Sequence, residues 1–296
     1  MNRIDPIILG DNQFLGISHL SQESGRTKME RFGDIEQIVN TIAFCAEMGV
    51  KGVSMSPHSR TGDIISLAKQ KGLRDLNFYP LIPYAAEYVR IAGEKGTVGL
   101  LNETLKSTSV LGKSKILFKG GMGLLRKDLY GLLGTLIDIE ISHFKGVPVK
   151  AVFLHNVLTD LALGLGLKEI FEFYIEYIEK NHKAYPGFAT MNFARLVKTF
   201  HEWGINDPLV MASFNKVGYQ MNPSKTECEQ CLADNDVEAL AMSTLASGRV
   251  KPKEAYEYLF SLPKVQSVAV GASTKEHAEE TFRIINEHLA IRAADS

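Results

Sequence analysis

The sequence carries almost no net charge. Its 33 lysine and arginine residues are balanced by 34 aspartate and glutamate residues, which gives a formal net charge of -1. A protein that holds a nucleic-acid backbone needs a basic surface, so nonspecific binding of DNA or RNA is not expected.

Cysteine and long apolar runs are also scarce. Three cysteines are too few, and odd in number, for a disulfide framework. No apolar run approaches the ~18 residues that span a bilayer, and the first five residues lack the apolar core of a secretory signal. These absences predict a soluble cytoplasmic protein without a membrane or nucleic-acid partner, and they leave its oligomeric state open.

The chain has 296 residues, of which 45% are hydrophobic, as in ordinary globular proteins. This length is about twice that of a usual domain, but it also suits one α/β barrel, which needs ~250 residues. No Pro/Ser-rich linker or block of charge divides the chain. We therefore expect residues 1–296 to form a single domain.

Short apolar runs alternate with longer amphipathic segments, as parallel strands alternate with crossover helices. The expected strands are Ile7–Leu9, Gly52–Met55, Leu76–Tyr79, Lys115–Phe118, Val149–Leu154, Gly187–Thr190, Leu209–Ser213, Val237–Met242 and Ser267–Val270. The expected helices include Ile35–Glu47, Leu167–Glu179, Phe193–Trp203, Glu254–Leu262 and Glu276–His288. The pattern predicts an α/β fold, a (β/α)8 TIM barrel, with an open doubly wound sheet as the alternative. No G-x-G-x-x-G follows a strand, which weighs against a dinucleotide-binding version of that sheet.

Nine expected strands are one too many for an eight-stranded barrel. Leu76–Tyr79, Lys115–Phe118 or the N-terminal run must therefore lie outside it. We expect the surplus length in an insertion in the first half and in a long loop, Asn12–Gly33, after the first strand. A loop of that length is often a lid over an active site.

Active sites of such barrels lie at the C-terminal ends of the strands. His155 follows the most apolar run, where an imidazole can move a proton near neutral pH or hydrogen-bond within the barrel rim. Lys119 follows another run and could stabilise an oxyanion, form a Schiff base or pair with Asp11, unless it is simply solvated. Asp11 follows the first run, and His58 lies just beyond the second.

Other polar residues at or near the strand ends are candidates for binding substrate. They are Asn12, Ser54, Asn156, Asn192 and Asn215. Their amide and hydroxyl groups can donate and accept hydrogen bonds, which suits a small polar ligand.

The last unit could bind a phosphate group. Ser273 and Glu276 have capping-box spacing, so the free N–H groups of this helix start could hold a phosphate beside Lys275. Ser247 and Gly248 end the preceding unit, and the loops after the last two strands are the usual phosphate site of barrels. An ordinary capped helix is the alternative.

Cys228 and Cys231 form a C-x-x-C pair. They follow Asn222 and Pro223, which predict the N-cap and first residue of a helix. The two thiols share a helix face, but a structural zinc site needs four ligands and no second pair with suitable spacing is present. No metal site is expected.

Several of these segments resemble the aldo-keto reductases. Ile8–Gly16 is similar to their first strand, Lys119 to their strand-three lysine, and Val152–His155 to the strand that carries their histidine. An apparent insertion then lies between strands two and three. In the C-terminal half the similar segments are Thr190–Phe193, Ser213–Asn215, Ala241–Gly248 and Val268–Ser273. The resemblance spans most of the chain and implies a barrel that reduces carbonyl compounds with NAD(P).

The chain departs from that family at its catalytic positions. The family uses an aspartate, a tyrosine, a lysine and a histidine. Ser54 stands where the aspartate belongs, and the tyrosine position falls at or beside His58. The pair that holds the nicotinamide amide aligns with Ala189 and Thr190, unless Asn192 substitutes.

The adenosine-phosphate site of the family is also only partly retained. His277 replaces its arginine and Thr281 its asparagine, whereas Glu280 is kept. Loss of the arginine weakens specific binding of a 2′-phosphate. The residues expected to bind the cofactor are Ser243, Ser247, Gly248, Gly271, Ser273, Lys275 and Glu280.

Three hypotheses of function follow. The first is a divergent NAD(P)-dependent oxidoreductase for a small polar carbonyl compound, in which Lys119 and His155 polarise the carbonyl and His58 donates the proton. The second is a lyase, aldolase or isomerase acting on a phosphorylated substrate, in which Lys119 reacts and Asp11 or His155 moves a proton. The third is a ligand-binding barrel without catalysis, because a fold alone does not imply an enzyme.

Overall fold

Eight parallel strands form a closed barrel in the computed structural model, which describes residues 3–15, 32–83, 127–262, 264–272 and 274–294. The strands are β1 (Ile7–Gly10), β2 (Gly52–Met55), β3 (Asn77–Ile82), β4 (Ala151–Leu154), β5 (Tyr185–Ala189), β6 (Leu209–Ser213), β7 (Glu238–Met242) and β8 (Val265–Val270). They are paired in chain order, and Ile8 of β1 lies opposite both Gly52 of β2 and Ala269 of β8. This last pairing closes the barrel.

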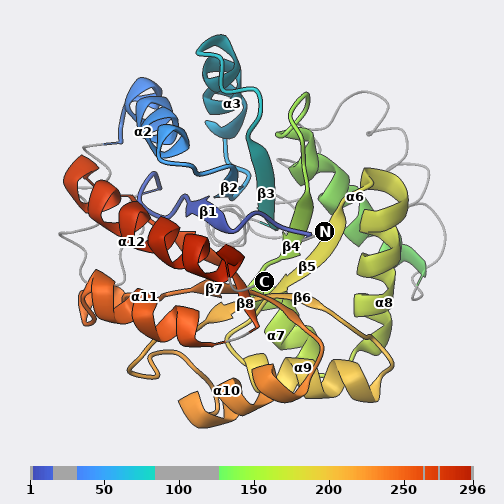
Figure 1. Cartoon of the computed structure of the whole chain (residues 1–296). Coiled ribbons are helices and arrows are strands. Elements are labelled where there is room, and N and C mark those ends of the chain that lie inside the picture. Colours follow the sequence, from blue (N-terminus) through green and yellow to red (C-terminus); the bar gives the residue numbers. More distant parts are fainter. Residues whose placement is uncertain (1–2, 16–31, 84–126, 263, 273, 295–296) are drawn as a thin grey trace.

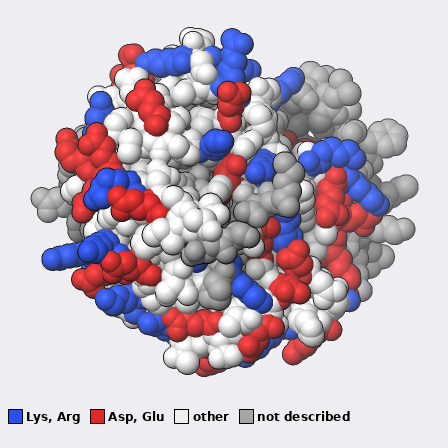
Figure 2. Space-filling view, in the orientation of Figure 1, with Lys and Arg blue, Asp and Glu red and all other residues white. Residues whose placement is uncertain are grey.

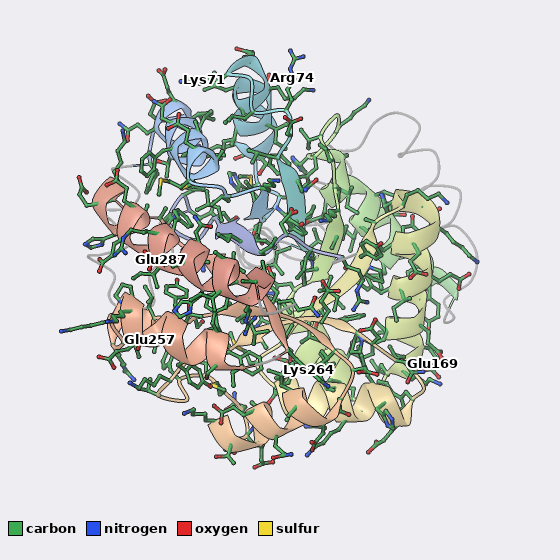
Figure 3. The ribbon with its side chains drawn as sticks, viewed as in Figure 1. Lys71, Arg74, Glu169, Glu257, Lys264 and Glu287 are labelled. Atoms are coloured by element: carbon green, nitrogen blue, oxygen red, sulfur yellow. The ribbon has the colours of Figure 1, made fainter. Side chains whose placement is uncertain are left out.

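Helices surround the barrel, as Figure 1 shows. They are α2 (Ile35–Glu47), α3 (Thr61–Gln70), α6 (Lys127–Ser142), α7 (Asn156–Gly164), α8 (Lys168–Tyr177), α9 (Phe193–Glu202), α10 (Lys225–Asp234), α11 (Pro252–Ser261) and α12 (Lys275–Ala294). Lysine and arginine side chains are interspersed with aspartate and glutamate over the visible face in Figure 2, in keeping with the net charge of -1. The charged residues labelled Lys71, Arg74, Glu169 and Glu257 in Figure 3 lie at the outer edge of this ring.

The predicted (β/α)8 barrel is confirmed, and the pairing of β1 with β8 excludes the open sheet. Eight of the nine expected strands take part. The ninth, Lys115–Phe118, lies outside the described residues, and β3 pairs directly with β4 through Leu81 and Phe153. The long connection therefore lies between strands three and four.

The expected insertion between strands two and three is wrong. Strand three is Asn77–Ile82 and not the segment before Lys119. Pro80 lies within this strand and cannot donate a hydrogen bond to a sheet, so the run looks short and peripheral in the sequence. Lys119 itself lies outside the described residues, as does most of the loop 12–33 that was expected to be a lid.

The strands are buried on both faces, because alternate residues point in opposite directions. Ile8, Tyr79 and Phe153 belong to the cluster inside the barrel. Residues of the other parity, such as Val53 and Phe188, pack against the surrounding helices. Burial of both faces determines which residues of each strand point into the barrel and which point toward the helices.

Polar groups close the N-terminal end of the barrel. The Tyr79 hydroxyl and the Asn77 amide donate to the Asp5 carboxylate at 2.6 and 2.8 Å, and Lys150 forms an ion pair with Asp5 at 3.2 Å. Arg3 pairs with Glu238 at 2.6 Å. Groups at this end of a barrel usually contribute stability and not catalysis.

Gly187 on β5 makes room for the Phe153 ring inside the barrel. A Cβ atom at this position would lie 2.6 Å from the ring, and overpacking of a core costs about 1–3 kcal/mol. We expect Gly187→Ala to lower the free energy of unfolding by that amount, measured by urea denaturation. Gly164→Ala is the control, because nothing lies within 4 Å of its added Cβ. Equal stability of the two variants would contradict this packing.

Candidate active site

Small residues predominate where the strands end inside the barrel. Alternation along the strands from the interior cluster places Gly10, Ser54, Ala189, Ser213 and Ala269 toward the interior near the C-terminal ends. In a (β/α)8 barrel this end carries the active site. The polar residues that follow each strand are therefore the first candidates for function.

Asp11 follows β1 directly and is buried, with 6% of its surface exposed. The backbone N–H of Ser56, just beyond β2, donates to its carboxylate at 2.6 Å. Burial removes the carboxylate from water and raises the pKa of Asp11 from 3.8 to about 6, although the hydrogen bonds of Ser56 act in the opposite direction. Asp11 can therefore hold or release a proton near neutral pH.

His58 does not have the properties of the expected proton donor. Burial and the neighbouring charge of Arg60 lower its pKa to about 4, so the cationic form is rare at neutral pH. Its Nδ1 accepts a hydrogen bond from the backbone N–H of Arg60 at 3.1 Å. The sequence placed His58 near the end of a strand, but it did not reveal the hydrogen bond that its ring accepts from Arg60.

His155 follows β4 and is half-buried. It is the N-cap of α7, and its Nδ1 accepts from the backbone N–H of Val157 at 3.2 Å. Burial lowers its pKa, and the negative charge of Asp160 acts against this shift. The neutral imidazole therefore carries its proton on Nε2, since Nδ1 acts as an acceptor.

Asp160 was missed by the sequence analysis. Its carboxylate accepts from the Thr190 hydroxyl at 2.5 Å and from the backbone N–H of Met191 at 3.0 Å. The Thr190 hydroxyl in turn accepts from the backbone N–H of Asn192 at 2.9 Å. An aspartate within a helix resembles a surface residue, so the sequence contains no signal for this contact.

Asn215, which was expected to bind substrate, has its side-chain amide engaged with the backbone. It is fully buried, and its amide exchanges two hydrogen bonds of 2.7 Å with the backbone of Tyr219. The adjacent Ser213 is the better candidate, because its buried hydroxyl has no hydrogen-bond partner among the described residues. A buried polar group left without a partner is costly unless a ligand or water satisfies it.

The other expected substrate-binding residues differ in exposure. Ser54 is buried on the inner face of β2, Asn156 and Asn192 are half-buried, and Asn12 is exposed. Asn192 precedes α9 without capping it through its side chain. No hydrogen bond joins these four side chains to one another in the described part of the chain.

The loop after β7 has an unusual backbone. Ser243, Ala246, Ser247 and Gly248 have φ angles of 56°, 47°, 57° and 80°. Non-glycine residues in this left-handed region carry strain, which often marks a ligand-binding loop. Gly271, after β8, approaches Gln13 so closely that a Cβ atom would lie 2.9 Å from its side-chain oxygen. The strained loop and the buried Ser213 hydroxyl, which has no partner among the described residues, are candidates for contact with a polar ligand.

The start of α12 is only partly as predicted. The helix begins at Lys275, and the Thr274 hydroxyl accepts from the backbone N–H of His277 at 3.2 Å. Ser273, the expected cap, lies outside the described residues. The Lys275 ammonium lies 5.4 Å from the centre of the Phe44 ring on α2. It therefore lies over a ring of α2 while the residue remains exposed.

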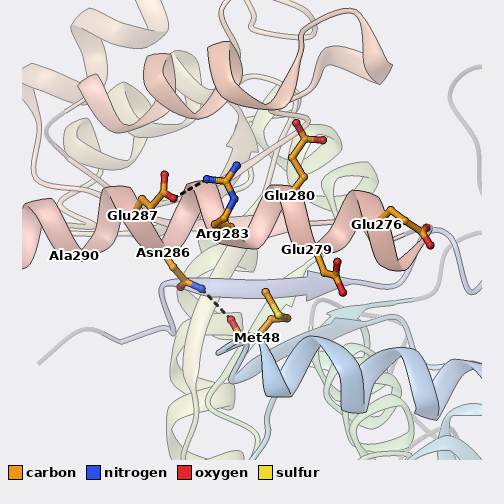
Figure 4. A pocket seen from close by; sticks show the side chains of 8 residues that line it. All are labelled: Met48, Glu276, Glu279, Glu280, Arg283, Asn286, Glu287 and Ala290. Carbon is orange, nitrogen blue, oxygen red and sulfur yellow. Dashed lines mark hydrogen bonds and ion pairs between the residues drawn. The ribbon is translucent and has the colours of Figure 1, made fainter.

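Glu280 lies further along α12, beside a shallow surface groove. Met48, Arg283 and Asn286 also line this groove, and Figure 4 shows Glu280 pointing away from the side on which Met48 lies. Asn286 donates to the backbone carbonyl of Met48 at 3.0 Å and so ties α12 to the end of α2. Lys275 and Glu280 thus belong to different surfaces of the helix.

The expected start of α10 is wrong by two residues. Ser224 is the N-cap and accepts from the backbone N–H of Glu227 at 3.2 Å, while the bond between Asn222 and Pro223 is cis. Over the residues that the structure describes, no cluster of three histidine, cysteine or acidic side chains has an arrangement suited to a metal ion. None of the described helices has the length and apolar character required to cross a membrane.

The buried Asp11 should make stability depend on pH. The pKa of Asp11 is about 6 in the folded protein and 3.8 in the unfolded chain. Between these values the unfolded chain loses its proton first, so the free energy of unfolding falls as the pH rises from about 4 to about 6. This difference corresponds to about 3 kcal/mol. We expect Asp11→Asn to be more stable than the wild type at pH 8 by up to that amount, and similar at pH 4, in urea denaturation. The exposed Asp234→Asn is the control; a parallel response of both variants would contradict the assignment.

The C-x-x-C pair should be chemically inert in the folded protein. Cys228 and Cys231 are buried, and burial raises the pKa of Cys228 to about 11 and also that of Cys231. Because the thiolate is the reactive form, we expect iodoacetamide to modify both thiols much faster in urea than in buffer at pH 7.5. Mass spectrometry of the peptides measures this, and rapid modification of the native protein would show that the thiols are accessible.

Comparisons with known proteins find similarity in structure and not in sequence. No family model matches the chain, and no curated protein matches its sequence. A structure from Pseudomonas aeruginosa described as an aldo-keto reductase superimposes with a TM-score of 0.61 and 13% identity, over 97% of this chain and 92% of that one.

Two further structures agree. An aldo/keto reductase from Brucella melitensis has a TM-score of 0.52 and 13% identity, over 96% of this chain and 93% of that one. The holo form of an aldo-keto reductase from Bacillus halodurans has a TM-score of 0.54 and 10% identity, over 85% and 82%. The chain therefore has the barrel fold of the aldo-keto reductases.

Proposed function

We propose that this protein is an oxidoreductase that reduces a small polar carbonyl compound with NAD(P)H. The observation that carries the proposal is the protonatable Asp11 carboxyl at the C-terminal end of a barrel of this fold. Reduction of a carbonyl needs a proton for the developing alkoxide, and an acid works best with a pKa near the working pH. Asp11 has this property, whereas His58 does not.

Asp11 also lies beside the place where the resemblance locates the missing tyrosine. It accepts a hydrogen bond from Ser56, two residues before His58. In our proposal the protonated Asp11 donates its proton to the carbonyl oxygen, and the carboxylate that remains is held by the Ser56 N–H. Two residues that follow neighbouring strands, Asp11 and Ser56, would thus take over the role of the absent side chain.

His155 has a second role in the proposal, that of orienting the substrate. Its Nδ1 is an acceptor for the N–H of Val157, so Nε2–H is left as a donor. Because burial lowers its pKa, the ring stays neutral and donates a hydrogen bond without losing a proton. Such a donor stabilises negative charge that develops on a carbonyl oxygen.

NAD(P)H would supply the hydride when it is bound. Ser213 would offer its buried hydroxyl to the nicotinamide end, while Ser243, Ser247 and Gly248 would hold the phosphates in the strained loop. The small side chain of Gly271 would let the chain pass close to the β1 loop. Lys275 and Glu280 have a smaller part than the sequence predicted, because they lie on different surfaces of α12.

The remaining hypotheses receive no support from the described residues. Both the lyase and isomerase hypotheses depend mainly on Lys119, which lies outside them. A binding protein without catalysis would not need a buried carboxyl group whose pKa is raised toward neutrality, and burying one costs stability. Carbonyl reduction is therefore the function that the site supports best.

The proposal is tested by cofactor binding and by the effect of Asp11 on activity. We expect NADH or NADPH to raise the melting temperature and a panel of small carbonyl compounds to oxidise the bound cofactor, measured at 340 nm. Since Asp11 must be protonated to act, kcat/KM should fall as the pH rises above about 6.

Asp11→Asn should lower kcat by about 10²- to 10⁴-fold, because the amide cannot donate an acidic proton. Asp234→Asn, exposed at the end of α10, serves as the control and should keep the wild-type rate. A protein that shows neither cofactor-dependent stabilisation nor oxidation of NAD(P)H would not have the proposed function. Activity that survives in Asp11→Asn would assign the proton to another group.

A further inference from the structure

Asp160 connects the ends of two neighbouring strands. It lies on α7, the helix that follows β4, and its carboxylate binds the Thr190 hydroxyl and the Met191 N–H just beyond β5. The bonds have lengths of 2.5 and 3.0 Å, and each carboxylate oxygen accepts one of them. Both carboxylate oxygens of Asp160 thus accept hydrogen bonds at the C-terminal end of the barrel.

The segment after β5 is held from several sides. The Thr190 hydroxyl donates to Asp160 and accepts from the N–H of Asn192, so the three residues form one chain of hydrogen bonds. Asn222, from the loop before α10, donates to the carbonyl of Met191 at 2.8 Å. Thr190 is fully buried. The position of Asn192 therefore depends on a buried hydroxyl that Asp160 orients.

Asp160 also acts on His155, the N-cap of its own helix. Both residues belong to the same short helical segment, and the charge of Asp160 favours the protonated imidazole. Among the described residues, no lysine or arginine forms an ion pair with Asp160. Its partners are neutral donors, so its negative charge is not cancelled locally and acts on the histidine.

We propose that Asp160 is a positioning residue that joins the ends of β4 and β5 into one preorganised rim, with His155 and Asn192 held toward the same ligand. This inference rests on the proposed function for its catalytic meaning. Hydrogen bonds that lock the supporting residues are what keeps such groups in a productive geometry.

A purely structural role for Asp160 makes a different prediction. If the carboxylate only stabilised the barrel as a whole, its loss would lower global stability and speed hydrogen exchange in β1 and β2 as much as after β5. The positioning role predicts local changes that are confined to His155 and to the segment of Met191 and Asn192. Measurements that need neither substrate nor cofactor separate these two roles.

The first experiment is an NMR titration of the His155 ring. The signal is assigned by its loss in His155→Gln. In Asp160→Asn, which keeps the shape and removes the charge, we expect the midpoint of His155 to move to lower pH, because the carboxylate favours the protonated ring. Asp234→Asn removes an exposed charge at the end of α10 and should leave the midpoint in place.

The second experiment measures hydrogen exchange of the Met191 and Asn192 amides. Asp160→Ala removes the acceptor of the Met191 N–H and releases the Thr190 hydroxyl. Because a hydrogen bond to a charged acceptor is lost, exchange should become at least about tenfold faster at these two amides. Amides of β1 and β2 should exchange as in the wild type.

If the midpoint of His155 stays unchanged in Asp160→Asn, or the two amides exchange no faster in Asp160→Ala, the proposal is overturned whatever the activity. If both change, the positioning role holds even where no carbonyl compound is reduced, so the two proposals fail separately. Where reduction is found, Asp160→Asn should lower kcat more than it raises KM, because the binding groups remain and their alignment is lost.

Discussion

The pairing of β1 with β8 is the constraint on which the rest of this structure depends. It joins the two ends of the chain, since Ile7 lies opposite Val268 and Leu9 opposite Val270. The Ser267 hydroxyl adds a hydrogen bond of 2.5 Å to the backbone carbonyl of Asp5. Closure brings all eight C-terminal strand ends into one ring, so residues as distant in sequence as Asp11 and Ser213 belong to the same end of the barrel.

Buried polar groups at the two ends of the barrel differ in how many hydrogen-bond and ion-pair partners they have. At the N-terminal end Asp5 has the donors Tyr79 and Asn77 and the cation Lys150, so its charge is well compensated. At the C-terminal end Asp11 has no such cation in the described part of the chain, and the Ser213 hydroxyl is left unpaired. Poorly satisfied buried groups cost stability and are characteristic of functional sites. The end with compensated charges and the end with the candidate site are thus separated by the length of the strands.

The rule that barrel sites lie at strand ends located Asp11 and His155 in the sequence, but not the condition of each group. Asn215 lies just beyond a strand end, but its side-chain amide is hydrogen-bonded to the backbone of Tyr219. His58 lies near a strand end as well, yet it is neutral and binds the N–H of Arg60. Asp160 is an exception, because it lies within a helix and contacts the end of β5 by accepting a hydrogen bond from Thr190. Whether a polar side chain has hydrogen-bond partners depends on the residues around it, and its position at a strand end does not reveal them.

The sequence by itself determined the class of fold and the positions of most elements, because hydrophobic periodicity and helix caps are local. Helix α2 spans the predicted Ile35–Glu47, with Asp34 accepting a hydrogen bond at its start. Only the tertiary structure decided that the third strand is Asn77–Ile82, since a short apolar run does not reveal its partner. It also decided that burial raises the pKa of Asp11 and that Asp160 on α7 binds the segment after β5. Burial, and contacts across 30 or more residues, govern both of these properties.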